Sequence, residues 1–562
     1  MSFLAAATGT AVAGLYLRYK HKEGIKAKNI ETLEQLRMAR LLKVQKEFSA
    51  QTFDLETDLI SKLSKQAQVA TVAECDKLPP SQQQERFYDA KVCTSHYAHW
   101  IDRVHNKDVL SFPQIIVRVH CEKDIQVCFD FVCKHHMAVS VAAGCHSANA
   151  MVDGCFTIDL AQMTRMEFDD AKQEVQVQAG STLHALDAFC RAKGRLVPVG
   201  TNGDTGVSGL TLSGGMGWFT RKFGFTVDHL VGIDIVLPTG QFLKNVREDS
   251  PHADLLWACR GSGGGFGIVT NFYFQTHPMP NDEQFLLGTV VSLCPTTSMK
   301  QTVVKSWWQK LNSCSNETMS ILVLPAAPVV PQLWVHYGPE ASQGKKAITL
   351  VPELQAASKS GGGLFDVENS WKVIGHPKLQ TLIAENQKHG YIYQSMVALT
   401  DMSDQVIDCL VEAIDKAPSS KCALIVIPVG GKSSTNDTPD CQKCSLSTRH
   451  AKVWILIEAI WDPAADGPIA GQKASCAWVR TFVKDINHKC GPCIAHTTHA
   501  FSDVRDENAG QGNNILVDVT KKEVAKRLKA IKSKVDPTNI LRNNRQLSTN
   551  HATKETNGDG KN

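Results

Sequence analysis

Two glycine-bearing stretches decide the fold: Gly144-Cys145-His146-Ser147 and, further along the chain, Gly206-Val-Ser-Gly-Leu-Thr-Leu-Ser-Gly-Gly-Met-Gly217. Glycine permits positive φ angles and lets the backbone approach a ligand closely. Backbone amides left unpaired in such loops bind phosphate oxygens. Together the two stretches predict a chain folded around a large phosphate-bearing ligand, and the first adds a nucleophilic imidazole at His146.

Strand-like and helix-like segments flank both stretches and predict an α/β arrangement. Residues 115–119 and 138–141 are apolar runs typical of strands, and 122–135 carries apolar residues at helical spacing. After a third strand at 175–178, Ser181 is a candidate N-cap for another helix. Neither glycine stretch has the Gly-x-Gly-x-x-Gly spacing directly after a first strand, which disfavours an ordinary Rossmann dinucleotide site.

Further motifs, in the same order, resemble the FAD-linked oxidoreductases of the vanillyl-alcohol oxidase superfamily, specifically the berberine bridge enzyme-like branch with its PCMH-type FAD-binding domain. The resemblance runs from about Phe112 to Arg545. Several spaced motifs in order are far more specific than any one of them. Besides the two glycine stretches, the motifs are Phe112-Pro-Gln-Ile-Ile-Val-Arg118, Asp153-Gly154, Val199-Gly-Thr201, Arg221-Lys-Phe-Gly224, residues 254–270 and Val535-Asp-Pro-Thr-Asn-Ile-Leu-Arg542.

The resemblance implies an α+β protein. An FAD-binding module of two α/β subdomains would precede a substrate module, in which helices back an antiparallel sheet. The alternation over 453–461 indicates a strand of that sheet with one face partly wet, and 521–534 suits a last helix that returns to the FAD module. The expected divisions are a leader or anchor (1–30), a helical extension (31–90), the FAD-binding domain (91–280), the substrate-binding domain (281–515), the returning segment (516–546) and a disordered tail (547–562).

The resemblance also assigns the cofactor-binding residues. His146 occupies the family position that bonds covalently to the methyl group on the flavin's benzenoid ring. Many relatives add a second, cysteinyl link, but Asn202 stands at that cysteine's place, so we expect FAD linked through His146 only. The expected FAD-binding residues are Ala142, Ala143, Gly144, Cys145, His146, Ser147, Thr205, Gly206, Ser208, Gly209, Leu212, Gly214, Gly215, Gly217, Gly264, Gly267, Ile268 and Val269.

The catalytic base is less well marked. The family commonly has a tyrosine before its closing helix, where this chain has Cys493. His496 and His499 are possible substitutes, since an imidazole can take an alcohol proton near neutral pH. Glu458 is another candidate if it points inward from its strand, and Tyr393 is expected to line the same cleft. Arg449-His450 lies near a family His-Arg pair, in reversed order.

The predicted activity is removal of a hydride from the carbinol carbon of an alcohol, sugar or secondary metabolite. Thr205 stands where relatives control access of oxygen to the flavin, and its small side chain favours reoxidation by dioxygen over another acceptor. The alternative is a catalytically degenerate FAD-binding protein with a binding or scaffold role. The missing tyrosine, the unusual Asn202 loop and Ala142-Ala143, where relatives often have Arg-Ser, motivate it.

Composition and net charge limit which other partners the protein can have. The 562 residues are 43% hydrophobic, enough for two or three domains with sizeable cores, and the net charge is only +4. That near-balance argues against nucleic acid as a partner. The 18 cysteines include Cys441, Cys444, Cys490 and Cys493 in two C-x-x-C pairs. Zinc ligation and a redox-active pair are alternatives there, but unremarkable thiols in a reducing compartment, without metal, are favoured.

The N-terminal segment lies outside the part of the chain that resembles the catalytic fold. An uncharged, Ala-rich run over 3–17 is shorter than a membrane-spanning helix and precedes, rather than follows, its basic residues. We expect a marginal membrane anchor that leaves the catalytic domain in the cytosol. A mitochondrial targeting helix and a leader of no targeting value are the alternatives. The basic residues are Arg18, Lys20, Lys22, Lys26 and Lys28.

Overall fold

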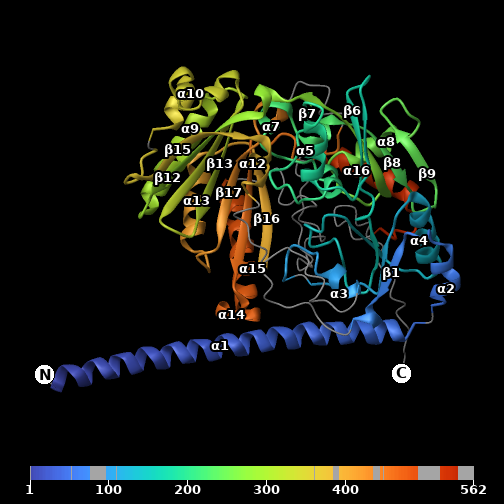
Figure 1. Cartoon of the computed structure of the whole chain (residues 1–562), viewed down its shortest axis with the longest axis horizontal. Coiled ribbons are helices and arrows are strands. Elements are labelled where there is room, and N and C mark those ends of the chain that lie inside the picture. Colours follow the sequence, from blue (N-terminus) through green and yellow to red (C-terminus); the bar gives the residue numbers. More distant parts are fainter. Residues whose placement is uncertain are drawn as a thin grey trace, which may run out of the picture.

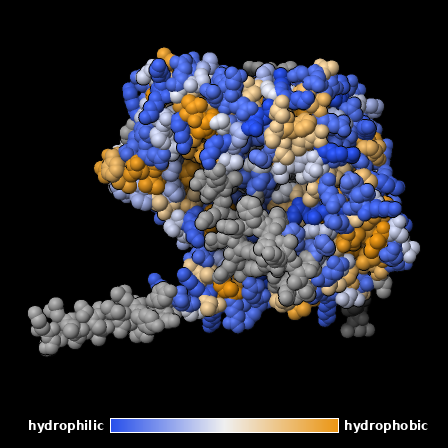
Figure 2. Space-filling view, in the orientation of Figure 1, coloured by the Kyte–Doolittle hydropathy of each residue, from blue (hydrophilic) through white to orange (hydrophobic). Residues whose placement is uncertain are grey.

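In the computed structural model, two modules lie side by side above one long N-terminal helix (Figure 1). Hydrophilic residues cover most of the described surface in the view of Figure 2, and the larger apolar areas are separate from one another. The structure describes residues 2–51, 53–75, 96–108, 110–359, 361–383, 391–434, 444–446, 448–490 and 519–541.

The first sheet of the FAD module carries the strand that leads into the Gly144 loop. Its order is β1-β2-β4-β3, with β2 and β3 both parallel to β4 and β1 antiparallel to β2. Helix α4 buries Ile125, Phe129 and Val132, the apolar face that the sequence predicts. The bounds are β1 Gln68–Thr71, β2 Ile115–Arg118, α4 Glu122–Lys134, β3 Val139–Ala142, β4 Phe156–Asp159 and α3 His96–Ile101.

The second sheet of this module is antiparallel, in the order β5-β6-β10-β8-β9. Helix α5 follows β6 and begins one residue later than expected: Thr182, not Ser181, is the N-cap, and its side chain accepts a hydrogen bond from the Ala185 amide. The bounds are β5 Met166–Asp169, β6 Glu174–Gln178, α5 Leu183–Arg191, β7 Arg195–Leu196, α6 Val207–Leu212, α7 Thr220–Phe223, β8 Leu230–Val236, β9 Phe242–Val246, α8 Ala253–Cys259, β10 Ile268–Gln275 and β11 His277–Pro278.

The substrate module is built on a seven-stranded sheet in the order β15-β12-β14-β13-β17-β18-β16, with antiparallel pairs throughout. The bounds are β12 Gln284–Leu293, α9 Thr297–Ser313, β13 Thr318–Pro325, β14 Val329–His336, α10 Lys345–Leu350, α11 Pro352–Ala357, β15 Asp366–Gly375, α12 His376–Thr381, β16 Tyr391–Leu399, α13 Asp404–Asp415, β17 Ala423–Pro428, β18 Val453–Trp461, α14 Pro463–Asp466 and α15 Pro468–Cys490.

Both faces of strand β18 are buried, so the expectation of a partly wet face is wrong. Ile455 and Ile457 lie in one core with side chains of α9, α13 and α15, whereas Trp454 and Leu456 lie in another with Phe219 and Phe225 of the FAD module. Helices cover the first face and the FAD module covers the second. The side chains of the second face therefore point toward the cofactor module.

The closing segment returns to the FAD module. Helix α16 (Val519–Val535) places Leu528, Ile531 and Val535 in the core of that module. The amide of Val139 on β3 donates to the carbonyl of Ile540, so the segment also extends the first sheet.

A single helix, α1 (Ser2–Ser49), replaces the separate leader and helical extension expected on either side of residue 30. It runs along the base of both modules (Figure 1): Leu33 belongs to the core of the substrate module, whereas Leu41 packs with Tyr97 and Trp100. Among the described residues, none of the helices combines the length and the apolar character needed to cross a membrane. The expected tail at 547–562 lies outside the described residues.

Candidate functional site

The two glycine stretches meet. A Cβ atom on Gly144 would lie 2.3 Å from the backbone nitrogen of Gly206, and one on Gly206 would lie 2.7 Å from the nitrogen of Gly144. Neither position has room for a side chain. Cys145 follows with a φ of 56°, which turns the backbone sharply before His146. The loops expected to hold one ligand are thus in direct backbone contact.

Unused hydrogen-bond donors gather around this contact. Among the described residues, no hydrogen bond uses the amide of Gly144, Cys145 or Ser147 as a donor. Three hydroxyl groups nearby are buried and have no partner among the described residues: Ser181, Thr211 and Ser213. Buried polar groups are nearly always hydrogen-bonded in folded proteins. A ligand rich in acceptor oxygens, such as the diphosphate of FAD, fits these donors.

The remaining expected FAD residues fall into two groups. Gly214 and Gly215 have φ angles of 107° and 73°. The Leu212 carbonyl accepts a 2.7 Å hydrogen bond from the amide of Gly263, so the 206–217 stretch packs beside the glycine-rich stretch 261–267. Most residues of the other group pack within the protein. Gly217 lies against Val199, Gly267 lies against Val236, Ile268 and Val269 pair with β8, and Ala142 is buried at the end of β3. Gly209 has open space around it.

His146 is held on two sides. Its Nε2 lies 2.9 Å from Oδ1 of Asp204, and its ring stacks on that of His105, with centroids 4.7 Å apart and 20° between the planes. Thr205, the residue expected to control oxygen access, follows Asp204 and fixes the loop through its backbone: its carbonyl accepts from Leu183. The imidazole expected to bond to the flavin is therefore oriented by residues of two other loops.

Glu458 and Tyr393 lie on opposite faces of the seven-stranded sheet. Glu458 shares its face with Trp454 and Leu456, which pack against the FAD module, and accepts a 2.9 Å hydrogen bond from Gln394. Burial raises the pKa of the Glu458 carboxyl above its usual value. Tyr393 lies in the core beneath the helices, with Arg480 over its ring. The structure brings Glu458, and not Tyr393, to the side of the cofactor module.

One loop links His146 to the strand that carries Gln394. His105, stacked on His146, is followed by Asn106, whose side-chain amide donates to the Ile392 carbonyl at 2.7 Å. Ile392 and Gln394 are two residues apart on β16 and thus face the same way. The bond from Asn106 therefore ties the segment next to His146 to the edge strand that carries Gln394.

Some of the other predicted residues lie outside the described part of the chain, and others have a different role from the one expected. His496, His499 and Cys493 lie outside the described residues. Arg449 is an inter-module bridge: its guanidinium pairs with Asp228 and contacts the Cys444 sulfur at 3.0 Å. Hydrogen bonding to Asp228 raises the Arg449 pKa, although burial opposes this. Its neighbour His450 is exposed.

The four cysteines of the C-x-x-C pairs are not brought together where they are described. Cys441 and Cys493 lie outside the described residues. Cys444 contacts Arg449, whereas the Cys490 sulfur lies 3.5 Å from that of Cys409 on α13. No group of three potential metal ligands occurs within the part of the chain that the structure describes.

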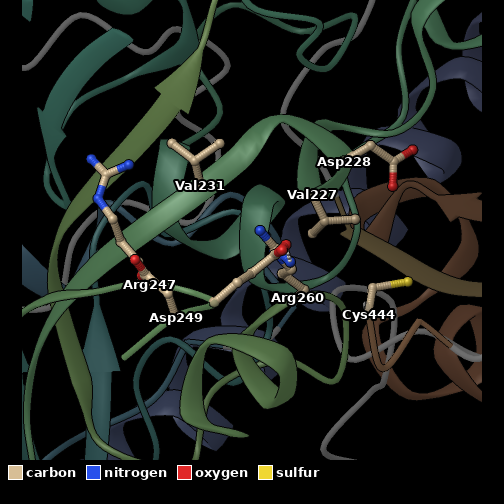
Figure 3. Close-up of a pocket in the computed structure, with 8 residues that line it drawn as sticks. Val227, Asp228, Val231, Arg247, Asp249, Arg260 and Cys444 are labelled. Carbon is tan, nitrogen blue, oxygen red and sulfur yellow. Dashed lines mark hydrogen bonds and ion pairs between the residues drawn. The ribbon is translucent and has the colours of Figure 1, made fainter. Parts of the chain in front are cut away.

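A polar cavity of about 440 Å³ lies on another side of the module interface (Figure 3). Most of its charged side chains already pair with one another or with neighbours: Arg260 with Glu248, Arg247 with Glu174, and Asp228 with Arg449. None of the expected FAD residues lines it. We therefore place the candidate site at the Gly144–Gly206 contact and not in this cavity.

Sequence reasoning missed Asp204 and His105 as neighbours of His146, and Asn106 as the link to β16. Asp204 stands two residues before Gly206, and His146 two residues after Gly144. The predicted convergence of the two glycine stretches was a signal that could have found the pair of Asp204 and His146. The sequence carries no comparable signal for His105.

Comparison with known proteins finds FAD-dependent relatives. Residues 113–245 match the family model described as an FAD binding domain. An FAD-linked oxidoreductase of Dictyostelium discoideum is 25% identical over 456 residues, which are 81% of this chain and 93% of that protein.

Solved structures share the fold. The 6-hydroxy-D-nicotine oxidase of Arthrobacter nicotinovorans has a TM-score of 0.66 at 21% identity, covering 87% of this chain and 99% of its own. A berberine bridge enzyme-like protein of Physcomitrella patens has a TM-score of 0.67 at 17% identity, covering 87% and 97%. The glucooligosaccharide oxidase of Acremonium strictum, with a 6-S-cysteinyl, 8α-N1-histidyl FAD, has a TM-score of 0.63 at 22% identity, covering 78% and 92%.

Proposed function

Since this chain belongs to the FAD-linked oxidoreductases of the PCMH-type FAD-binding family, we propose that it oxidises the carbinol carbon of a small alcohol, sugar or secondary metabolite, with dioxygen as the final electron acceptor. The observation that carries the proposal is the buried carboxyl of Glu458, which faces the FAD module and has a raised pKa.

The residues around the Gly144–Gly206 contact would hold the cofactor. The amides of Gly144, Cys145 and Ser147 and the hydroxyls of Ser181 and Ser213 supply donors for the diphosphate. FAD supplies a hydride acceptor when bound. His146 anchors the ring covalently, and the histidyl link in the glucooligosaccharide oxidase supports this role. Asn202 has no thiol for a second link, so attachment is through His146 only.

Glu458 would accept the hydroxyl proton of the substrate. Loss of a hydride from a carbinol carbon yields a carbonyl only if the hydroxyl proton also leaves, so the reaction needs a base. A carboxyl with a raised pKa is a stronger base than an exposed one. Gln394 donates to Glu458 and so fixes where the carboxylate points.

Dioxygen is the proposed acceptor because Thr205, next to the glycine contact, carries a small side chain. Anaerobic reduction followed by admission of air tests the whole proposal. Across a panel of alcohols and sugars, at least one substrate should bleach the flavin absorbance, and air should restore it with formation of hydrogen peroxide. Bound FAD that no substrate bleaches would favour the alternative, a catalytically degenerate FAD-binding protein.

Acid denaturation tests the covalent link separately. Yellow colour should stay with the precipitated wild-type protein and should leave the His146→Ala variant, because only His146 offers a nucleophile at the matched position. Complete release of flavin from the wild type would remove covalent attachment from the proposal without removing FAD-dependent oxidation.

A further inference from the structure

We propose that Asp204 is a positioning residue for flavin attachment: its carboxylate keeps the proton of His146 on Nε2, so that the bond to the flavin forms at Nδ1. The inference rests on the covalent FAD of the proposed function. It goes further by naming the residue that prepares His146 and the ring nitrogen that reacts.

The contact between His146 and Asp204 sets the tautomer. Nε2 of His146 lies 2.9 Å from Oδ1 of Asp204. A carboxylate oxygen this close repels a ring lone pair and favours an N–H, so the ring nitrogen that faces Asp204 carries the hydrogen. A neutral imidazole has one N–H and one nitrogen with a lone pair. With the hydrogen on Nε2, the lone pair and hence the nucleophilic character belong to Nδ1.

The ring orientation is fixed as well. His105 covers one face of the His146 ring, and the His105 amide donates to the Cys145 carbonyl at 2.9 Å. Arg103, two residues earlier, donates to the Ala143 carbonyl and pairs with Asp159. The segment that carries His105 is thus bonded to the Gly144 loop on both sides of the glycine. The stack and these hydrogen bonds hold the plane of the imidazole beside Asp204.

Backbone packing brings the pair together. Gly144 and Gly206 touch with no room for a Cβ atom, and His146 and Asp204 each stand two residues from that contact. The side chains of His146 and Asp204 are 21% and 35% exposed, so the pair is only partly screened by water. Asp204 belongs to the loop in which many relatives carry their second, cysteinyl link. This chain has a carboxylate there, directed at the first link.

The chemistry of attachment shows what the carboxylate contributes. A bond forms between Nδ1 and the methyl carbon on the flavin's benzenoid ring, and one C–H bond of that methyl group breaks and releases its proton. The two electrons enter the flavin, and dioxygen then removes them and is reduced to hydrogen peroxide. The imidazole gains positive charge as the bond forms. Asp204 offsets this charge at Nε2, which lowers the barrier.

Attachment kinetics test the proposal. Flavin-free protein from riboflavin-starved cells is mixed with FAD in air, and bound flavin fluorescence on denaturing gels follows the covalent fraction. Asp204→Asn should bind FAD, with the visible spectrum of the wild type, but attach it about tenfold more slowly, because a neutral amide replaces the negative charge beside Nε2. Asp204→Glu should recover part of the rate. The matched control Asp170→Asn removes an exposed carboxylate and should attach FAD at the wild-type rate.

The linked nitrogen gives a second, independent readout. Digestion of the wild type should release a histidyl-flavin that co-elutes with the Nδ1-linked standard. Linkage through Nε2, or an Asp204→Asn variant that attaches FAD as fast as the wild type, would overturn the role of Asp204 while leaving the proposed function intact. Wild-type protein without any covalent flavin would instead refute the covalent attachment on which the inference rests. If Asp204→Asn does not fold, the linked nitrogen still decides.

Discussion

Glu458 is a residue at which stability and chemistry oppose each other. Burial raises the pKa of its carboxyl, so the folded protein favours the neutral form more than the unfolded chain does. The stability associated with the neutral form is fully present below the pKa of the unfolded chain, 4.5, and is lost as pH rises through the folded pKa. A base must be ionised to act, so the proposed activity rises over the range in which stability falls.

Replacing Glu458 by glutamine should separate the two effects. Glu458→Gln should retain FAD but reduce it roughly 100- to 10,000-fold more slowly, the usual contribution of a positioned base. Stopped-flow measurement of flavin bleaching under anaerobic conditions checks this. In the wild type the rate should rise with pH through the raised pKa, and in the variant that dependence should vanish.

Tyr393→Phe is the matched control for Glu458→Gln. Tyr393 lies on the neighbouring strand but on the helix-covered face, so its hydroxyl should have no part in flavin reduction. A wild-type bleaching rate in Tyr393→Phe, beside a slow Glu458→Gln, would support the proposed base. Equal rates in the wild type and Glu458→Gln would eliminate it.

At the scale of elements, α16 is fixed to the FAD module by one buried ammonium group. The Nζ of Lys532 donates to the carbonyls of Gly265 and Leu541, and it pairs with Asp536, which is itself buried. Gly265 belongs to the glycine-rich stretch 261–267, which contains the expected FAD residues Gly264 and Gly267. This helix therefore supports the cofactor loop directly.

Removing the Lys532 charge should loosen both the helix and the cofactor loop. Lys532→Met leaves Asp536 buried without its partner, which should lower the free energy of unfolding by about 3–5 kcal/mol. Chemical denaturation measures this loss, and the variant should also retain less FAD after gel filtration. Lys529→Met removes an exposed charge from the same helix and should change stability little. Equal stability of the two variants would contradict the structural role of Lys532.

Helices α5 and α12 join the two modules through a second buried group. The Gln380 amide donates to Asp187, and burial raises the pKa of the Asp187 carboxyl to about 7. Asp187 Oδ1 and Gln380 Oε1 are buried without other partners among the described residues. A neutral Asp187 satisfies this pair better than an ionised one. The stability it gives is present below the unfolded pKa of 3.8 and is lost as pH rises to about 7.

Asp187→Asn should remove that pH dependence. The asparagine amide can donate to Gln380 Oε1 at any pH, so the variant should exceed the wild type in stability at pH 8 by roughly 1–4 kcal/mol, given about 1.4 kcal/mol for each pKa unit. Thermal unfolding from pH 4 to pH 8 checks this. A variant whose stability falls in parallel with the wild type would show that Asp187 does not cause the loss.

At the scale of the whole molecule, two modules face each other across one interface, and α1 crosses the base of both. The docked part of α1 begins near Asn29, whose side-chain amide donates to the Ala464 carbonyl, and continues through Leu33 and Leu41. The apolar and basic residues expected to associate with a membrane all precede Asn29. We propose that this preceding part anchors the protein to a membrane and leaves the catalytic modules in the cytosol.

Deletion of residues 1–28 should therefore release the protein without unfolding it. Full-length protein should sediment with membranes and the shortened chain should stay in the supernatant, because the basic flank and the apolar run are gone. Both should melt at similar temperatures, since the docked contacts begin at Asn29. Equal solubility of the two forms would refute the anchor, and removal of the first residues in cells would favour a mitochondrial destination.

The sequence alone determined the local elements and the class of ligand. The glycine stretches, the apolar strand over 453–461 and the helical spacing over 122–135 are local signals, because backbone freedom and side-chain periodicity act over a few residues. The FAD module, the antiparallel substrate sheet and the role of His146 were predicted from the resemblance of the ordered motifs to the berberine bridge enzyme-like family. The single helix α1 was not predicted, because its apolar start and its docked end differ in composition and were treated as separate segments.

Only the tertiary structure decided which side chains meet. Alternation along a strand puts Glu458 and Ile457 on opposite faces, but β18 is apolar on both, so the sequence could not tell which face meets the cofactor module. Asp204 and His146 are far apart in the chain and meet because two glycines allow their backbones to touch. His105 reaches His146 through a loop that has no periodicity at all. Contacts between distant segments depend on the packing of the whole chain, and local propensity does not encode them.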